Sequence, residues 1–533
     1  MKIQISKESR LVLFVFVLCF MVAFSPYVRP DLVKGSDDTF HLIRIETLAT
    51  AIARGEFPVK FHSDLCYGYG YGVGFFYSDF FLYIPAVLIN LGFSLEVAYK
   101  LFAGLILAVT FWGMYLSVWK LTKNLRSALM AASLYLLSVS VLRNIYQAFA
   151  TSRALAMIFL PMAIIGMYLL LTENRGRELL IAGFSGLIYS HVLMTVLAVA
   201  VCICMVVICW RKWIRNGEKW KSLIISVISV CVLTAASWIP MLEQWAVQEY
   251  RAAVPWTWVD ENVVLMKDLL SDESVGRFLL ALILIQLFYL MIHDGWKGKW
   301  SIFLGLGFGF WGITIIYKFW HITRNAFKFL QFPDRLFPIA TTLFILGVAC
   351  WIASWQLEKR IMTGCMALII VFNIGYAYQY MVPRIEDTMD LGYTTLHEEI
   401  AGLGAGEEWL PIQTTRDYLV LPREAKTPEG LSAGGEAREN KFSFMVDTDD
   451  YYDIPFVWYK GFYAETQEGE TVRTGQVPET GLVRVFTDEL KAGDIVTVWY
   501  RGTIAQKISY IITIAGCIYA VGWIIKNRKK ILN

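Results

Sequence analysis

Long apolar stretches separated by short polar segments dominate this chain. A helix that crosses a bilayer needs about 20 predominantly apolar residues. We expect a membrane-spanning helix in each of twelve stretches: residues 10–28, 98–119, 126–142, 154–172, 178–190, 192–210, 221–241, 276–293, 300–318, 336–356, 361–381 and 506–525. The pattern therefore predicts a polytopic α-helical membrane protein of about 12 spans. Its weakest point is the pair 178–190 and 192–210, because the first is short and almost nothing separates the two.

The basic residues indicate how the spans are oriented. Lys and Arg are enriched in the cytoplasmic loops of membrane proteins. If the further apolar stretch 78–95 does not cross, every basic cluster falls on one side: Lys2/Lys7/Arg10, Lys120/Lys123/Arg126, Arg175/Arg177, Arg211/Lys212/Arg215/Lys219/Lys221, Lys297/Lys299, Lys359/Arg360 and Lys526/Arg528/Lys529/Lys530. We therefore expect 78–95 to lie along the outer surface and both termini to be cytoplasmic.

Composition and charge divide the chain further. Hydrophobic residues make up 56% of it, and the mean hydropathy is +0.50, as in polytopic membrane proteins. Residues 382–505 hold 23 acidic and 11 basic residues, a net charge of −12 that leaves +15 for the rest. Short alternating runs such as "GLVRVFTDEL", separated by turn signals such as "SAGGE", predict a small, mainly β domain there, a sandwich facing outward. We expect a transmembrane catalytic domain at 1–381, this extracytoplasmic domain at 382–505, and a final span with a basic tail at 506–533.

Two adjacent carboxylates follow the first span, in the outer loop 29–97. In "KGSDDTFHLIRIE", Ser36 can cap a helix whose first turn contains Asp37 and Asp38. Asp37, His41 and Arg44 are spaced to share one face of this helix. An apolar stripe on the same helix predicts that it is amphipathic and lies at the membrane surface.

These side chains can do acid–base or metal chemistry. One carboxylate could take a proton from an acceptor hydroxyl as a general base. Asp37 and Asp38, with His41, could instead hold a divalent cation such as Mg²⁺ or Mn²⁺ that neutralises a phosphate leaving group. Acidic residues also stabilise a first helical turn by about 0.3–1 kcal/mol, which explains one aspartate better than two beside a histidine. The sequence leaves these roles open.

Further polar residues lie at the outer ends of the expected spans, whereas the spans themselves carry almost no charge. A transporter usually keeps ionisable groups near the membrane midplane. The pattern instead favours chemistry at the outer membrane–water boundary, where several cations would suit the phosphate of a lipid-linked substrate. The candidate binding residues are Tyr77, Arg153, His191, His321, Arg324 and Arg335, together with His41 and Arg44.

Three segments resemble known families. They are the G-x-D-x-x-x-H pattern at 35–41 with the glycine- and aromatic-rich stretch "GYGYGVGFFYSDFFLYIP", the segment "FKFLQFPDRLFP" with its QFPxR pattern, and "EEWLP" at 407–411. The chain resembles the bacterial membrane proteins labelled "6-pyruvoyl-tetrahydropterin synthase-related" and the YfhO-like family. Both look like GT-C class glycosyltransferases. The sequence has no residues for pterin chemistry.

The resemblance implies a glycosyltransferase of the bacterial cell membrane, acting on its outer face. A polyprenyl-phosphate-linked sugar would be the donor, and a cell-surface glycopolymer or glycolipid the acceptor, with no nucleic-acid partner. The acidic motif of the first outer loop in GT-C enzymes corresponds to Asp37 and Asp38, and the QFPxR segment contains Arg335. Two alternatives stay open: a lipid or sugar transporter or flippase, and a non-catalytic cell-envelope scaffold.

Overall fold

The computed structural model describes residues 6–293, 298–355, 357–385, 388–389, 407–447 and 449–532. These fall into two compact units: Met1–His41, Ser94–Val230 and Pro255–Leu391 form the first, and Leu42–Phe93, Cys231–Val254 and Gly392–Asn533 form the second. The domain boundaries expected from sequence stay a prediction. Part of the expected outer domain, residues 390–406, lies outside the described residues.

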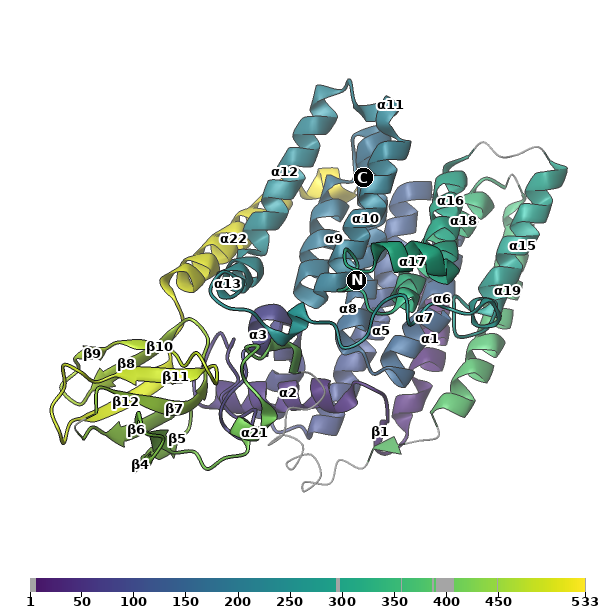
Figure 1. Ribbon diagram of the computed structural model, residues 1–533. Helices are drawn as coiled ribbons and strands as arrows, with labels where there is room; N and C mark the ends of the chain where they lie inside the picture. Colours follow the sequence, from purple (N-terminus) through teal and green to yellow (C-terminus); the bar gives the residue numbers. More distant parts are fainter. Residues whose placement is uncertain are drawn as a thin grey trace, which may run out of the picture. The chain divides into compact units, whose positions relative to one another are not determined.

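The first unit is a bundle of helices (Figure 1). Its helices are α1 (Lys7–Phe24), α5 (Leu95–Thr122), α6 (Leu125–Leu136), α7 (Val139–Leu142), α8 (Thr151–Glu173), α9 (Arg177–Ser190), α10 (Val192–Ile208), α11 (Trp210–Trp213), most of α12 (Gly217–Leu233), α14 (Met266–Leu269), α15 (Arg277–Ile292), α16 (Lys299–Gly312), α17 (Tyr317–Thr323), α18 (Phe337–Ala353) and α19 (Lys359–Met381). Helices suit such apolar segments because each one satisfies its backbone polar groups internally.

Local sequence signals set several of these helix ends. Ser94 caps α5 by accepting from the amide of Val97, and α5 ends at Thr122, directly before Lys123, which adopts left-handed φ of 54°. Asn124 then caps α6 by accepting from two amides of its first turn. Small residues allow α8 and α9 to pack closely: a Cβ on Gly183 would lie 2.4 Å from the backbone nitrogen of Ala163.

Each of the twelve predicted spans coincides with a helix or a pair of helices. Within the described residues, six helices are long and apolar enough to cross a membrane, or up to nine if each bent pair is one span. Helices α9, α10 and α15 have only 14, 17 and 16 residues. The protein therefore has the architecture of a multi-pass membrane protein, while the count of twelve spans stays a prediction.

The ambiguous stretch 78–95 is too short a helix to cross. It contains a 3₁₀ turn at Phe80–Leu82 and α4 at Tyr83–Asn90. Eleven helical residues extend about 16 Å, against about 30 Å for the hydrocarbon core of a bilayer. This agrees with the expectation that 78–95 does not span the membrane.

The helix after the first span differs from its prediction. It forms α2 at Asp38–Ala53, which begins two residues after Ser36, one residue later than expected. The Ser36 hydroxyl lies 3.1 Å from the Ala148 carbonyl and 3.2 Å from Asp37 Oδ1. Most of α2 is buried on all sides, including the polar side chains of His41 and Arg44. The expectation of an amphipathic surface helix is therefore wrong, since protein covers the face that was expected to meet water.

The second unit contains most of α2, short helices and the β domain. Its other helices are α3 (Val73–Phe76), α4, α13 (Ala235–Trp245), α21 (Arg416–Leu419) and α22 (Ile504–Leu532). The strands are β3 (Ala425–Lys426), β4 (Ser432–Gly434), β5 (Glu436–Arg438), β6 (Lys441–Met445), β7 (Tyr451–Val457), β8 (Phe462–Thr466), β9 (Thr471–Val472), β10 (Thr474–Gln476), β11 (Leu482–Phe486) and β12 (Ile495–Tyr500).

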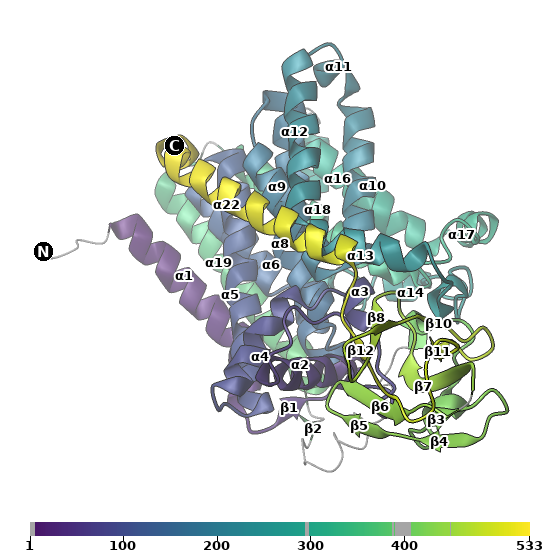
Figure 2. The same cartoon turned by 90° about the vertical axis from the view of Figure 1, so that its left-hand side faces the viewer.

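These strands form the predicted β sandwich (Figure 2). One antiparallel sheet has the order β10-β11-β7-β3-β4 and the other β5-β6-β12-β8-β9. Aromatic side chains join the two sheets: Phe444 of β6 lies 4.9 Å from Tyr452 of β7, and Phe456 of β7 lies 5.5 Å from Phe462 of β8, between ring centres. The alternation along β11 and β12 places every second side chain in this core.

Candidate active site

The loop that carries the acidic motif is held to a backbone segment more than 100 residues away. The amide of Ser36 donates to the carbonyl of Gln147 at 3.3 Å, and that of Asp37 to the carbonyl of Ala148 at 3.0 Å. Gly35 allows this approach, because a Cβ there would lie 2.5 Å from Cβ of Phe149. The glycine of the G-x-D pattern therefore places Asp37 against the segment that precedes α8.

Asp37 is the accessible carboxylate of the pair. Its side chain is 42% exposed, and Oδ2 lies 3.8 Å from a guanidinium nitrogen of Arg153. Its other oxygen accepts from the Ser36 hydroxyl at 3.2 Å. Arg153 lies in the first turn of α8, so the loop and the helix bring together two of the residues expected from sequence.

Asp38 is turned into the loop instead. Its side chain is buried, and both of its oxygens accept hydrogen bonds. The Gly35 amide donates to Oδ2 at 3.0 Å, while the amide and hydroxyl of Thr39 donate to Oδ1 at 2.6 and 3.1 Å. This arrangement stabilises the turn that leads into α2, and it leaves Asp37 as the carboxylate open to a second reactant.

His191 and Arg335 belong to the same neighbourhood as Arg153. His191 joins α9 to α10, and its Nδ1 accepts from the Met194 amide at 3.3 Å, which places the proton on Nε2. Burial, then the positive charges of Arg153 and Arg335, lower the pKa of His191 well below its usual value. Arg335 follows the QFP segment and donates to the Leu330 carbonyl at 2.8 Å. This end of the bundle thus combines a neutral histidine with two cations, of which Arg153 faces Asp37.

His321 and Arg324 form a second group, around an aspartate that the sequence analysis missed. Nδ1 of His321 lies 2.8 Å from Asp260 Oδ2, and a guanidinium nitrogen of Arg324 lies 3.8 Å from the same oxygen. The guanidinium carbon of Arg324 is also 4.1 Å from the Trp258 ring centre. Burial would raise the pKa of Asp260, but the bond from His321 and the charge of Arg324 lower it.

Arg44 and Tyr77 lie in the second unit, within a buried ion-pair network around Asp79. The Arg44 guanidinium donates to Asp79 Oδ1 at 2.5 Å and to the Tyr77 carbonyl at 3.0 Å, and its carbon lies 5.1 Å from the Tyr77 ring centre. His62 Nε2 lies 3.0 Å from Asp79 Oδ2. Burial would raise the pKa of Asp79, but the charges of Arg44 and His62 hold it well below its usual range.

His62 bridges two polar side chains. Its Nδ1 lies 2.9 Å from the Thr47 hydroxyl, which also lies 2.9 Å from the Ile43 carbonyl, and its Nε2 lies 3.0 Å from Asp79 Oδ2. The hydrogen bonds of Arg44 within this network are structural, and its role toward a substrate stays a prediction.

Lys60 makes the stability of the folded protein depend on pH. Its Nζ donates to the Gly74 carbonyl at 3.1 Å, and burial lowers its pKa to about 8, against the opposing effect of the Asp79 charge. The unfolded chain holds this proton to about pH 10.5, so the folded protein gains stability as the pH rises from about 8 to about 10.5. We expect Lys60→Met to lack that gain, measured as the thermal unfolding midpoint at about pH 7.5 and 9.5. An equal gain in wild type and variant would contradict the lowered pKa.

The remaining expected residues are packed in the interior. His41 is buried, its amide donates to the Asp37 carbonyl at 3.2 Å, and its ring meets Phe40 edge to face at 5.2 Å. Phe75 and Phe76, in the aromatic stretch that follows α2, are also buried, in the second unit. Phe76 stacks on Trp409 at 4.6 Å, so protein contacts and not lipid explain these rings.

The described residues contain no cluster of ligands of the kind expected for a divalent cation at Asp37, Asp38 and His41. Within the described part of the chain, no group of three or more His, Cys, Asp or Glu side chains could hold a metal ion. Asp37 faces Arg153, whereas both oxygens of Asp38 are bonded to the loop. Asp37, Asp38 and His41 therefore do not converge as a cation site made by the protein alone.

Asp79 and Asp260 are the acidic residues that the sequence reasoning missed. Asp79 stands alone among aromatic and apolar residues in "GFFYSDFFLYIP". A carboxylate in such a stretch needs a buried partner, since an unpaired buried charge is very costly. That signal could have found the pairing of Asp79 with a basic residue, although it could not have identified Arg44 and His62.

No protein-family model matches the sequence, and no curated protein matches it either. The structure resembles several solved ones. Arabinofuranosyltransferase AftD from Mycobacteria aligns over 93% of this chain and 40% of its own, with 14% identity and a TM-score of 0.49. ArnT from Cupriavidus metallidurans, bound to undecaprenyl phosphate, aligns over 73% of this chain and 68% of its own, with 15% identity and a TM-score of 0.42.

A third similar structure is the archaeal oligosaccharyltransferase AglB from Archaeoglobus fulgidus, in complex with an inhibitory peptide and a dolichol-phosphate. It aligns over 74% of this chain and 56% of its own, with 10% identity and a TM-score of 0.38. The chain spans less than half the length of AftD. At these identities and TM-scores, the similarities assign neither a fold family nor an activity to this chain, and the resemblance to the YfhO-like family stays a prediction.

Proposed function

We propose that this protein is a membrane glycosyltransferase that transfers a sugar from a polyprenyl-phosphate donor to an acceptor hydroxyl. The observation that carries the proposal is the position of Asp37. It is a partly exposed carboxylate, 3.8 Å from Arg153, and Arg153 and Arg335 lie near enough to His191 to lower its pKa. A base and two cations beside an apolar bundle provide the groups that transfer from a lipid phosphate requires.

Asp37 is the proposed general base. The acceptor oxygen attacks the anomeric carbon of the sugar and forms the new glycosidic bond. The bond between that carbon and the phosphate oxygen breaks, and polyprenyl phosphate leaves with the electron pair. The acceptor hydroxyl proton passes to Asp37, so the step balances, with inversion at the anomeric carbon.

Arg153 and Arg335 are the proposed ligands of the donor phosphate, because a guanidinium binds phosphate with charge-assisted hydrogen bonds. Neutral His191 carries its proton on Nε2, which is the proposed donor to the same phosphate. His321 and Arg324 remain candidates through their group around Asp260, and His41 through its backbone bond to Asp37. Asp38 supports the loop, and no resident Mg²⁺ or Mn²⁺ enters the proposal.

We assign the reaction to the outer face of a bacterial cell membrane, with both termini in the cytoplasm. The basis is the charge asymmetry of the loops, which places the basic clusters inside. A polyprenyl-linked donor suits that side, and the acceptor would be a cell-surface glycopolymer or glycolipid. The β sandwich would then face outward with the acceptor.

The proposal is tested by assaying the purified full-length protein in liposomes. Labelled polyprenyl-phosphate sugars would be supplied with envelope extracts as acceptors. We expect a covalently labelled product that depends on one donor sugar. Transport or flipping of the labelled lipid without covalent product would overturn the proposal in favour of a transporter, and absence of donor binding would favour a scaffold.

Removal of either proposed phosphate ligand should weaken donor binding. We expect Arg153→Gln and Arg335→Gln each to raise KM for the donor about 10- to 100-fold, because each removes a charge-assisted contact worth about 1.5–3 kcal/mol. Arg277→Gln is a matched control, since Arg277 is 71% exposed and pairs with Asp272. Initial rates over a range of donor concentrations give the comparison. Unchanged KM in both variants, or an equal rise in the control, would contradict these roles.

A further inference from the structure

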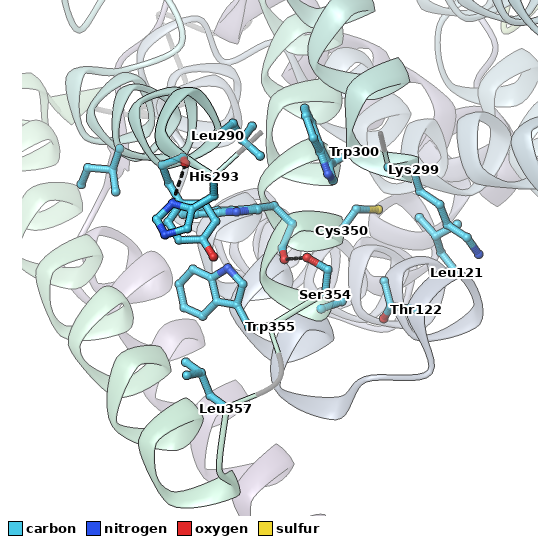
Figure 3. A pocket seen from close by; sticks show the side chains of 15 residues that line it. Leu121, Thr122, Leu290, His293, Lys299, Trp300, Cys350, Ser354, Trp355 and Leu357 are labelled. Atoms are coloured by element: carbon cyan, nitrogen blue, oxygen red, sulfur yellow. Dashed lines mark hydrogen bonds between the residues drawn. The ribbon is translucent and has the colours of Figure 1, made fainter. Parts of the chain in front are cut away.

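A large pocket lies in the first unit (Figure 3). Its volume is about 970 Å³, within the range of ligand-binding cavities, and α5, α15, α16 and α18 supply much of its wall. Leu121 and Thr122 bring the last residues of α5 into it. Trp300 and Cys350 contribute from α16 and α18.

The pocket and the candidate active site lie near opposite ends of α5. Tyr99, in the first turns of α5, bonds Thr151, which is two residues before Arg153. Leu121 lines the pocket 22 residues later, which corresponds to about 33 Å along a helix. That distance matches the thickness of the hydrocarbon core of a bilayer. The pocket is therefore a separate site.

Two buried hydrogen-bond donors line the pocket. The indole nitrogens of Trp351 and Trp355 are buried and donate to no protein acceptor among the described residues. The Trp351 side chain is 5% exposed. Leaving such a donor unsatisfied is costly, so each one is expected to have a partner. Both belong to the same pocket wall, which points to one ligand with hydrogen-bond acceptors.

The rest of the wall favours a lipid over a small polar molecule. Rings form a continuous apolar surface: Trp351 lies 4.8 Å from Trp355 and 5.6 Å from Tyr289, which stacks on His293 at 4.2 Å. Among the described residues that line the pocket, none is Asp or Glu. Hydrocarbon suits this ring surface.

Charge at this end of the bundle supports an anionic headgroup. Lys299 lines the pocket, although its ammonium pairs with Glu173 at 2.9 Å. Lys123 follows the end of α5, and Lys359 and Arg360 begin α19; all three are exposed. Basic residues next to membrane spans attract anionic lipids. The expected orientation places this end at the inner leaflet.

We propose that this pocket binds the phosphate-bearing headgroup of an anionic phospholipid. The indole N–H groups of Trp351 and Trp355 donate to its phosphate or ester oxygens, and its chain lies against Tyr289 and Trp300. Lys299 in the wall favours the anionic headgroup over a zwitterionic one, as do Lys123, Lys359 and Arg360, which follow lining residues closely in sequence. This site is independent of the proposed transfer reaction.

The test compares lipid binding by the full-length protein in a neutral detergent, measured by native mass spectrometry. Phosphatidylglycerol and phosphatidylcholine with identical chains are the probes. We expect tighter binding of phosphatidylglycerol by wild type, and about tenfold weaker binding by the double variant Trp351→Phe/Trp355→Phe, because it loses two hydrogen bonds and keeps the ring surface. Trp256→Phe is the matched control, since Trp256 is 69% exposed and lies outside the pocket.

A second variant tests the pocket without changing its donors. Ala353 lines it, and Ala353→Phe should fill part of the space and also weaken phosphatidylglycerol binding. Binding unchanged by both the double variant and Ala353→Phe would overturn the proposal. Equal binding of the two lipids by wild type, or displacement of phosphatidylglycerol by inorganic phosphate, would overturn the assignment to an anionic lipid.

Discussion

Asp37→Asn is expected to lower the rate of sugar transfer by a factor of about 10² to 10⁴, the range that general-base catalysis contributes. Asparagine keeps the size of the side chain and can still accept from the Ser36 hydroxyl, but it cannot take the acceptor proton. Donor binding should change little, because the proposed phosphate ligands are Arg153 and Arg335. The measurement is the initial rate of labelled product at saturating donor, alongside donor binding.

Two other aspartates supply the controls for Asp37. Asp31 is exposed in the same loop, with left-handed φ of 64° that asparagine also tolerates, so Asp31→Asn should transfer sugar normally. Asp38→Asn should act mainly on folding, because its carboxylate accepts three hydrogen bonds from Gly35 and Thr39. A fully active Asp37→Asn variant would show that another group is the base, whatever the result with Asp38.

Asp79→Asn is expected to destabilise the folded protein by about 3–5 kcal/mol, the cost of breaking a buried ion pair by removing one partner. Arg44 and Asp79 have side chains only 1% and 3% exposed, so neither water nor a rearranged surface can replace the lost charge. His62 would lose its partner as well. The expected result is a lower thermal unfolding midpoint and a smaller yield of monodisperse protein.

The control is a second arginine–aspartate pair in the same unit. Arg54 and Asp64 lie 3.0 Å apart, with side chains 24% and 29% exposed, so Asp64→Asn should cost at most about 1 kcal/mol. The pH dependence gives another readout. Because the folded-state pKa of Asp79 is depressed, its stabilisation is present at neutral pH and is lost only as the pH falls below about 4. Similar losses in the two variants would contradict the special role of the buried network.

Arg44 has a task apart from the proposed chemistry. Its guanidinium bonds the second turn of α2 to Asp79 and to the Tyr77 and Ser78 carbonyls. The charged groups in "DDTFHLIR" therefore have separate tasks: Asp37 is the proposed base, and Arg44 holds its part of α2 within the second unit.

Local sequence patterns predicted most helices of this protein, two strands of its β domain and the division between its basic and acidic parts. Apolar stretches of near bilayer length predicted the helices, the alternation in "GLVRVFTDEL" and "DIVTVWYRG" predicted β11 and β12, and the charge balance set 382–505 apart from the rest. These properties depend on neighbouring residues, since hydropathy and period act over one helix or one strand. The same local signals located the acidic motif and the QFPDR segment.

Contacts between distant segments, which local patterns do not show, determine which of these side chains act together. Asp37 meets Arg153, 116 residues away, while its neighbour Asp38 turns into the loop. The spacing predicts that Arg44 and Asp37 share a helical face, but Arg44 pairs with Asp79 instead. Such outcomes depend on contacts between distant segments and on burial, which turned an expected surface helix into an interior one. Periodicity cannot encode them, because it fixes where a side chain starts on its own helix and not what the folded chain places against it.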